Sequence, residues 1–289
     1  MINSERKGEW YMLILALLES WFPIVLIFAY QFIEPIFAYS ITVSFAALFF
    51  IVMVIYKKSY HEYRNKAGYR DLLLTALYIT LLFLLVFTGL KFTTASNMAM
   101  ILFLQLFFAF FYFNIIGKEP IDRPHLIGAV LMGGGAVVIL FPKELHFNIG
   151  DLMVLVAAMI APLANYYQKR SRRYLSSHSI LAFRYIVAIP FLFTIAYLFE
   201  PLPSIQAFNL ALPYLLVSGF LVMGLAKIFW IEAIYLISIT KASAMAALTP
   251  LLTIFFAYLF LDEVPTLTQL IAIIPIIVGG YMITRPINK

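Results

Sequence analysis

The sequence contains no cysteine, and only 12% of its 289 residues are charged. The absence of thiols excludes disulfides, thiolate nucleophiles and cysteine-based metal sites. The charged fraction is about half of that in an ordinary soluble domain, and no long polar stretch could form a separate soluble domain. Glycine-rich phosphate loops and serines beside a suitable base are also missing. The histidines lie in loops or at the ends of apolar runs, without metal-ligand spacing: His61, His125, His146 and His178. We therefore expect no enzyme, cofactor or metal site.

Hydrophobic residues, in contrast, make up 64% of the chain. They form apolar runs of about 20 residues, the length of a membrane-spanning helix. The first run is too long for a signal peptide and has no small-residue cleavage site, so we interpret it as a span. The pattern predicts an all-α membrane protein with ten transmembrane helices, at residues 10–30, 35–56, 71–90, 93–115, 124–142, 150–168, 178–199, 210–233, 238–260 and 266–284.

Two stretches of the chain, 94–135 and 241–280, resemble each other. The matching positions are Ala95-Ser96 with Ala242-Ser243, Met98 with Met245, Glu119 with Glu263, and Gly135 with Gly279. We infer a first repeat at 9–142 and a second at 150–284, each with five spans. An odd number of spans makes the second repeat enter the membrane inverted. Inverted repeats are common in secondary transporters, whose substrate sites lie where the halves meet.

The basic residues predict the orientation, because cytoplasmic loops are enriched in lysine and arginine. With the N-terminus in the cytoplasm, 16 of the 20 basic residues fall on that side, and an even number of spans returns the C-terminus there. Lys91 and Lys143 lie outside, and Arg184 and Lys227 lie within spans. We expect a multi-pass protein of the bacterial inner membrane. The basic clusters are explained by topology and lipid headgroups rather than by nucleic acid.

The second repeat also carries a family pattern. The segment 242–247 (Ala-Ser-Ala-Met-Ala-Ala), followed by Pro250, Glu263, Gln269 and Gly279-Gly280, resembles the second EamA-type repeat of the drug/metabolite transporter superfamily. The first repeat departs from it, with Phe103 at the place of Pro250. The resemblance covers nearly the whole chain and implies ten helices in two inverted halves that move small organic solutes, often outward.

Four ionisable residues lie inside predicted spans, where charges are costly and mark functional sites. Glu232 is closest to the end of its span, and we expect it to reach the lipid headgroups. Glu19, Arg184 and Lys227 lie at similar depths, roughly 8 to 13 Å from the inner ends of their spans, so we expect them in one cavity, with Glu19 as the partner of Lys227. In the repeat alignment they match uncharged residues: Ala161, Ser40 and Thr80, respectively. A structural ion pair for Glu19 and Lys227, and an Arg184 that reaches the lipid interface, remain open alternatives.

Further candidates complete the expected binding or coupling site. They are the aromatic residues Trp21, Trp230 and Tyr78, the polar residues Asn97, Gln105 and Asn165, and the helix-breaking residues Pro23, Pro162 and Pro250. Proline lacks the backbone N–H and therefore frees a carbonyl and bends a helix. We expect Pro23 to interrupt the first span beside Glu19, and Pro162 and Pro250 to interrupt the sixth and ninth spans.

These observations predict a secondary transporter, and more specifically an exporter, of a small organic metabolite. A zwitterion such as an amino acid would suit an acidic and a basic group together, and protons are the coupling ion that we consider. The first alternative is a multidrug or quaternary-amine transporter with an aromatic cage. The second is a membrane scaffold that moves no solute. The sequence leaves the oligomeric state open.

Overall fold

The computed structural model describes residues 2–116, 123–140, 148–237, 242 and 245–284. The part of the chain that it describes contains helices and no strands. The α-helices are α1 (Ile2–Ser20), α2 (Phe22–Ala29), α3 (Pro35–Tyr56), α4 (Tyr69–Leu90), α5 (Ala95–Phe103), α6 (Gln105–Phe110), α7 (Arg123–Leu140), α8 (Ile149–Ser171), α9 (Ser177–Phe199), α10 (Ile205–Val217), α11 (Lys227–Leu236), α13 (Leu248–Leu261) and α14 (Leu267–Ile283). Short 3-10 helices η1 (Ser59–Arg64) and η2 (Lys66–Gly68) precede α4, and π-helical segments η3 (Phe111–Ile116) and η4 (Ser218–Ala226) follow α6 and α10.

Eight of the described helical stretches are long and apolar enough to cross a membrane. Four of them combine several elements: α1 with α2, η2 with α4, α5 with α6 and part of η3, and α10 through α11. The shorter apolar helices α13 and α14 follow. Together these helices form an integral, multi-pass membrane protein. Glu119 and Ser243, which contribute to the repeat alignment, lie outside the described residues.

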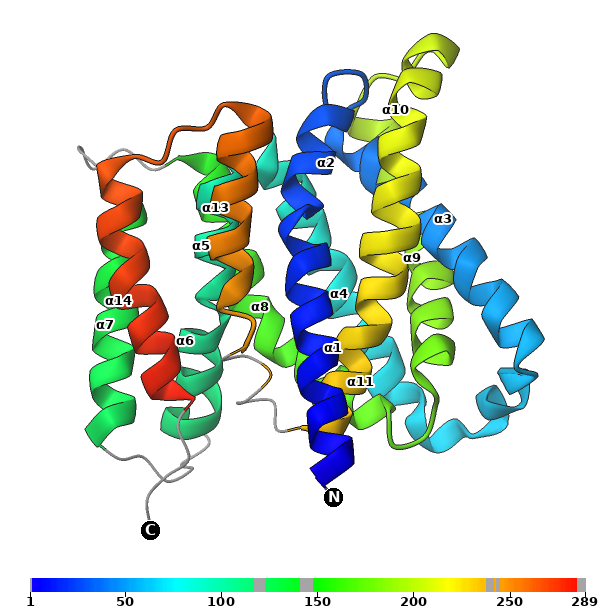
Figure 1. Cartoon of the computed structure of the whole chain (residues 1–289). Coiled ribbons are helices and arrows are strands. Elements are labelled where there is room, and N and C mark those ends of the chain that lie inside the picture. Colours follow the sequence, from blue (N-terminus) through cyan, green and yellow to red (C-terminus); the bar gives the residue numbers. More distant parts are fainter. Residues whose placement is uncertain (1, 117–122, 141–147, 238–241, 243–244, 285–289) are drawn as a thin grey trace.

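The two halves of the chain pack against each other helix by helix. In the described chain, α3 packs on α9, α5 on α13 and α7 on α14, so that equivalent helices of the two repeats are neighbours. The remaining helices pack on helices of the other repeat that are not their equivalents: α1 on α11 and α4 on α8. Figure 1 shows α7 and α14 side by side at one edge of the bundle, and the other pairs beside them. The interior between the repeats is therefore enclosed by helices from both.

Glycine allows the closest of these approaches. A Cβ atom on Gly279 would lie 2.5 Å from the carbonyl oxygen of Gly128, and one on Gly128 would lie 2.7 Å from that of Gly279. On the next turns of α7, a Cβ on Gly135 would lie 2.6 Å from Ile276, whereas Gly134 has open space around it. The α7–α14 contact therefore depends on particular glycines and not on all three of the Gly133–Gly135 run.

The expected helix interruptions are present at some prolines and absent at others. The first span breaks at Trp21, between α1 and α2, and Pro23 occupies the first turn of α2. Pro250 similarly lies in the first turn of α13. In contrast, α8 continues through Pro162 without ending, which corrects the interruption predicted there. A buried transmembrane helix tolerates an internal proline, since packed neighbours and local adjustments compensate for the missing hydrogen bond.

Carboxylates from one repeat accept hydrogen bonds from helix starts in the other, where backbone N–H groups have no partner within the helix. At one end of the bundle, Glu200 accepts bonds of 2.8 Å each from the backbone N–H groups of Ile36 and Phe37 at the start of α3. Glu263 accepts bonds from the N–H groups of Ala95 and Ser96 at the start of α5, at 3.0 and 3.3 Å. These contacts fix the ends of helices that enclose the interior.

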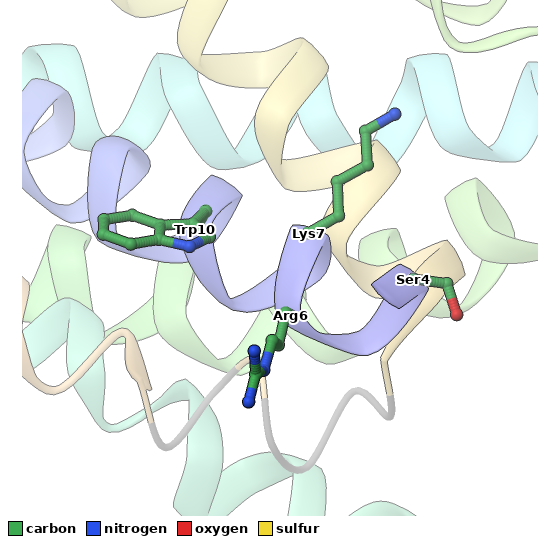
Figure 2. Close-up of a pocket in the computed structure, with 4 residues that line it drawn as sticks. All are labelled: Ser4, Arg6, Lys7 and Trp10. Carbon is green, nitrogen blue, oxygen red and sulfur yellow. The ribbon is translucent and has the colours of Figure 1, made fainter. Parts of the chain in front are cut away.

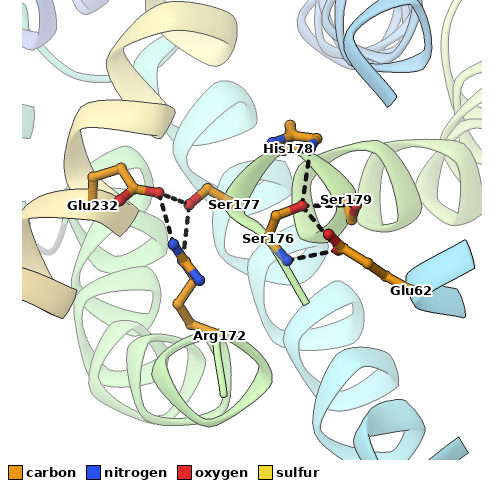
Figure 3. A network of polar contacts seen from close by, with 7 residues as sticks. All are labelled: Glu62, Arg172, Ser176, Ser177, His178, Ser179 and Glu232. Atoms are coloured by element: carbon orange, nitrogen blue, oxygen red, sulfur yellow. Dashed lines mark hydrogen bonds and ion pairs between the residues drawn. The ribbon is translucent and has the colours of Figure 1, made fainter. Parts of the chain in front are cut away.

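A third such carboxylate lies at the opposite end, where α1 begins. Glu62, in η1, accepts hydrogen bonds from the backbone N–H and hydroxyl of Ser176, at 2.8 and 2.9 Å, just before α9 (Figure 3). Burial raises the pKa of Glu62, but the hydrogen bonds from Ser176 and Ser179 outweigh it, so the pKa lies below its usual value. Glu62 is therefore charged at neutral pH and holds the start of α9.

Candidate functional site

Two adjoining cavities lie between the repeats and share six lining residues: Glu19, Phe83, Leu102, Gln105, Lys227 and Ala246. We treat them as two lobes of one cavity. The polar lobe is also lined by Asn165, Gln168, Arg184 and Trp230, and the apolar lobe by Phe22, Met98, Phe103 and Pro250. Each lobe encloses about 90 Å³, which is room for several water molecules. The cavity is thus large enough to be wet and is built by both halves of the chain.

The junction of the two lobes holds an ion pair. The ammonium group of Lys227, at the start of α11, donates a hydrogen bond to the carboxylate of Glu19 on α1. The ammonium nitrogen also lies 5.0 Å from the centre of the Phe83 ring. The two charged side chains keep 26% and 12% of their surface exposed, for Glu19 and Lys227 respectively. Both charged groups line a cavity with room for water, so both can be reached from it.

A π-helical segment places Lys227 at this junction. Segment η4 ends at Ala226, directly before Lys227. Within it, Gly219 approaches α3 so closely that a Cβ atom would lie 2.7 Å from the side chain of Phe45. Wide turns of this kind are often found at functional sites because they shift the residues that follow around the helix. The sequence showed only an uninterrupted span here.

Arg184 lies deeper, at the polar lobe, and is only 2% exposed. Its guanidinium donates one 2.7 Å hydrogen bond to Gln168 Oε1 and another to the hydroxyl of Tyr185. That hydroxyl in turn donates to the carbonyl oxygen of Met223, at 2.6 Å. Arg184 therefore turns toward the protein interior and does not reach for the lipid interface, the alternative left open by the sequence.

Neutral polar side chains connect three helices along the polar lobe. Trp230 of α11 donates from its indole nitrogen to Asn165 Oδ1 of α8, at 3.2 Å. Asn165 donates to Gln105 Oε1 of α6, at 3.4 Å. All three were expected at the site from the sequence, and all three line the cavity. Their hydrogen bonds orient polar groups around the ion pair.

Other predicted site residues lie elsewhere. Trp21 packs against Phe256 and Phe260 in tilted contacts, with its ring centre 4.7 and 4.8 Å from theirs. Tyr78 stacks on Tyr167 at 5.7 Å. Neither Trp21 nor Tyr78 is among the residues that line the two lobes. Trp21 neighbours Glu19 in sequence, but two residues along a helix point to different sides.

Asn97 and Pro162 are also absent from the residues that line the lobes. Asn97 donates to Asp151 of α8 at 3.3 Å and accepts a 2.8 Å hydrogen bond from Gln269 of α14. The span that carries both Asn97 and Gln105 is interrupted at Leu104, where α5 ends and α6 begins. Asn97 therefore ties helix ends together, while Gln105 borders the cavity.

Sequence reasoning missed the phenylalanines that line the cavity. Phe22, Phe83 and Phe103 each border the cavity, but in a chain with 28 phenylalanines they carry no signal that separates them from packing or lipid-facing residues. Phe22 follows the helix break at Trp21, and Phe103 ends α5 beside the break at Leu104. Only the path of the backbone directs these rings inward.

A polar network closes the end of the bundle where α1 begins (Figure 3). Glu232 of α11 accepts hydrogen bonds from Arg172 Nη2, at 3.2 Å, and from the hydroxyl of Ser177. His178 is within hydrogen-bond distance of Ser176 and Ser59, at 3.0 and 2.9 Å. The network joins α8, α9, α11 and η1, so it holds these helices together at this end of the bundle.

A shallow depression at the start of α1 is lined by Ser4, Arg6, Lys7 and Trp10. Figure 2 shows that these side chains point away from one another, so they do not converge on a ligand. Trp10 is 64% exposed, as expected for an aromatic residue at a membrane interface. The cavity between the repeats is therefore the better candidate site.

Apolar spanning helices around an internal polar cavity define the class: a multi-pass membrane protein with the architecture of a transporter. The chain belongs to the EamA-like transporter family, whose model matches it twice, at residues 6–141 and 148–285. This family is part of the drug/metabolite transporter superfamily. The two matches confirm the resemblance and the two-repeat architecture expected from the sequence.

Among curated proteins, the chain is 25% identical to the uncharacterized transporter YoaV of Bacillus subtilis, over 70% of each protein. It is 21% identical to an uncharacterized transporter of Synechocystis, over 68% of this chain and 60% of that protein. A protein of known crystal structure aligns over 95% of both chains, with a TM-score of 0.69 and 15% identity. That last likeness concerns the fold alone.

Proposed function

We propose that this protein is a secondary transporter that exports a small organic metabolite, such as an amino acid or a related zwitterion, across the bacterial inner membrane. In this proposal ten spans form two inverted five-helix repeats, 9–142 and 150–284, and both termini are cytoplasmic. The membership in a transporter family and the basic residues near the span ends support it. The helix pairing across the repeats is the arrangement on which alternating access depends.

The observation that carries the proposal is the Glu19–Lys227 ion pair at the junction of the two lobes. A scaffold has no need for a cavity between its repeats, and a buried ion pair is weak as a stabilising device. A transporter, in contrast, needs charges that are available to its substrate. A zwitterion can take the place of the intramolecular contact, with its ammonium on Glu19 and its carboxylate toward the basic groups of the polar lobe, Lys227 and Arg184. Protonation of Glu19 would release Lys227 in the same way and couple transport to protons.

Broken helices beside the cavity supply the points of bending. The first span is interrupted at Trp21 and the fourth at Leu104, and both breaks are next to residues that line the apolar lobe. Bending at these points can open the cavity alternately to the two sides, while the carboxylates at the helix ends hold the scaffold together.

The geometry favours a zwitterion over a quaternary amine. An aromatic cage requires free ring faces, but Lys227 already occupies the region above Phe83. Trp21 packs against Phe256 and Phe260 and does not line the cavity. The lobes are also smaller than the typical drug-sized site of about 300–1,000 Å³. The volume and the occupied ring both disfavour a bulky cation.

The test begins with a thermal-shift screen of purified protein against metabolites, because a ligand that binds only the folded state stabilises it. Flux of a radiolabelled hit is then measured in proteoliposomes. We expect Glu19→Gln to reduce flux about 10- to 100-fold, the effect of losing a charge-assisted hydrogen bond, in protein that still elutes as a single peak. Unchanged flux in this variant would remove Glu19 from the mechanism.

The proposed topology has its own test, since the chain contains no native cysteine to interfere. Single cysteines at Lys66 and Arg173 should react with an impermeant thiol reagent from the cytoplasmic side, and a cysteine at Lys91 should react from the outside. Labelling of positions 66 and 173 from opposite sides would contradict the inverted repeat.

A further inference from the structure

The polar lobe contains a buried positive charge without a countercharge. Arg184 is 2% exposed, and no carboxylate of the described residues lies within ion-pair distance of it. Its Nε–H has no hydrogen-bond partner among the described residues either. A buried guanidinium without a carboxylate is costly unless water or a ligand compensates for it.

The neighbours of Arg184 hold it in place without neutralising it. Gln168 and Tyr185 are buried, uncharged acceptors of its two terminal nitrogens. Tyr185 is itself fixed by its hydrogen bond to Met223 and packs its ring 4.6 Å from the guanidinium carbon. The guanidinium is therefore oriented in advance, which lowers the cost of binding a planar anion.

The charged residues that line the cavity also carry a net positive charge. Glu19 and Lys227 neutralise each other, and Arg184 leaves the cavity with one excess positive charge. Its counterpart in the repeat alignment is Ser40, whose hydroxyl donates a hydrogen bond to the carbonyl oxygen of Ile36 in its own helix. The apolar lobe, with Phe22, Met98 and Phe103, lies on the other side of the ion pair.

We propose that Arg184 is the carboxylate-binding residue of the cavity and that the ligand is a small organic acid with an apolar body. The carboxylate binds at Arg184 in the polar lobe, and the hydrocarbon part lies in the apolar lobe. An amino acid satisfies this description, with its ammonium group at Glu19. The inference rests on the proposed function for the role of the cavity, but it concerns binding and is tested without transport.

The test compares three probes of equal chain length on purified protein in detergent: hexanoate, hexanamide and hexylammonium. The thermal shift is measured as a function of concentration up to 50 mM. We expect hexanoate to bind at least tenfold more tightly than either other probe, which is about the factor for one charge-assisted hydrogen bond. Equal binding of all three, tighter binding of hexylammonium, or no shift with any of them would overturn the assignment.

Variants then locate the effect. Arg184→Gln should abolish the preference for hexanoate, and Arg184→Lys should retain part of it, because lysine keeps the charge but loses the planar fork. Arg173→Gln is the matched control, since Arg173 is exposed at the same end of the bundle and does not line either lobe. A preference that survives in folded Arg184→Gln protein would show that Arg184 is structural.

The two proposals fail separately. Binding of hexanoate through Arg184 without flux of any solute in proteoliposomes would leave the carboxylate site in place and refute the transporter. Flux of a neutral or cationic solute that is unaffected by Arg184→Gln would support the transporter and refute the carboxylate site.

Discussion

Glu62 and Glu200 lie at opposite ends of the bundle, yet each accepts two hydrogen bonds from the start of a helix in the other repeat. The charges in the cavity follow no such rule, because Glu19, Lys227 and Arg184 match uncharged residues in the repeat alignment. These contacts recur in both repeats because each repeat has helix starts whose backbone N–H groups need hydrogen-bond acceptors. A substrate has no twofold symmetry, so residues that bind it have no reason to recur.

We expect the largest effect from a variant that removes one of the cavity charges, which do not recur in the two repeats. Lys227→Met leaves Glu19 without its partner, and we expect flux to fall about 10- to 100-fold. Removing one partner of a buried pair costs about 3–5 kcal/mol. Because 26% of Glu19 and 12% of Lys227 remain exposed, we expect a smaller loss of stability, about 2 kcal/mol after solvent screening. Flux assays and thermal unfolding measure the two effects.

The double variant Glu19→Gln with Lys227→Met separates structure from function. It removes both charges, so thermal stability should return close to that of the wild type while flux stays low. A double variant that transports normally would show that the pair only orients α1 and α11.

A second prediction concerns the helix contact at α7 and α14. Gly135→Ala places a Cβ atom 2.6 Å from Ile276 and 2.9 Å from the carbonyl oxygen of Ala272. We expect a loss of about 1–3 kcal/mol, typical of overpacking, measured by thermal unfolding. Gly134→Ala is the control, since it meets no atom within 4 Å. Equal melting temperatures for the two variants would contradict the close contact.

The helix-end carboxylates should affect stability more than flux. Glu263→Gln weakens the hydrogen bonds to the start of α5 and should cost about 1–2 kcal/mol, with flux retained in the remaining folded protein. Glu34→Gln is the comparison, because Glu34 forms an ion pair with Lys91 in which the side chains are 36% and 42% exposed. Such pairs contribute about 0–1 kcal/mol. A larger loss of stability from Glu34→Gln than from Glu263→Gln would contradict this prediction.

The smallest effect is a pH dependence that distinguishes the two ends. Burial raises the pKa of Glu200 above its usual value, despite the opposing N–H groups of Ile36 and Phe37, and nearby Glu34 adds to the rise. The pKa of Glu62 is lowered. The stability that Glu62 contributes is present above its unfolded pKa and is lost as pH falls through its lower folded pKa. Glu200 contributes in the opposite direction, because protonation below its raised folded pKa relieves the burial of its charge.

Thermal unfolding between pH 3.5 and 7 measures this difference. Glu62→Gln should reduce the loss of stability toward acid pH, and Glu200→Gln should steepen it. Identical pH profiles for the two variants would show that the two carboxylates are equivalent.

Part of the site follows directly from sequence positions. A charge in an apolar span is visible without a structure, and depth along a helix follows from the rise per residue. This reasoning brought Glu19, Lys227 and Arg184 to one region, where the cavity joins them. It failed for Trp21 and Asn97, because their side chains point to neighbours that sequence spacing does not reveal.

Helix irregularity accounts for most of the remaining difference. The π-helical η4 rotates the residues around Lys227, and the break at Leu104 separates Asn97 from Gln105. Neither irregularity contains a proline from which it could be predicted. Pro162, in contrast, predicts a break in α8, but the helix is continuous there. Hydrophobic periodicity is also uninformative when both the lipid-facing and the inward-facing sides of a helix are apolar.

The amino-acid sequence alone determined that this chain is a helical membrane protein made of two related halves, because twenty-residue apolar runs and a repeated pattern admit no other arrangement. Only the tertiary structure decided which aromatic rings border the cavity, and that one N–H of the Arg184 guanidinium at the polar lobe has no hydrogen-bond partner among the described residues. The reason is physical: a membrane span requires only local hydrophobicity, whereas a binding site requires distant helices to meet at defined angles.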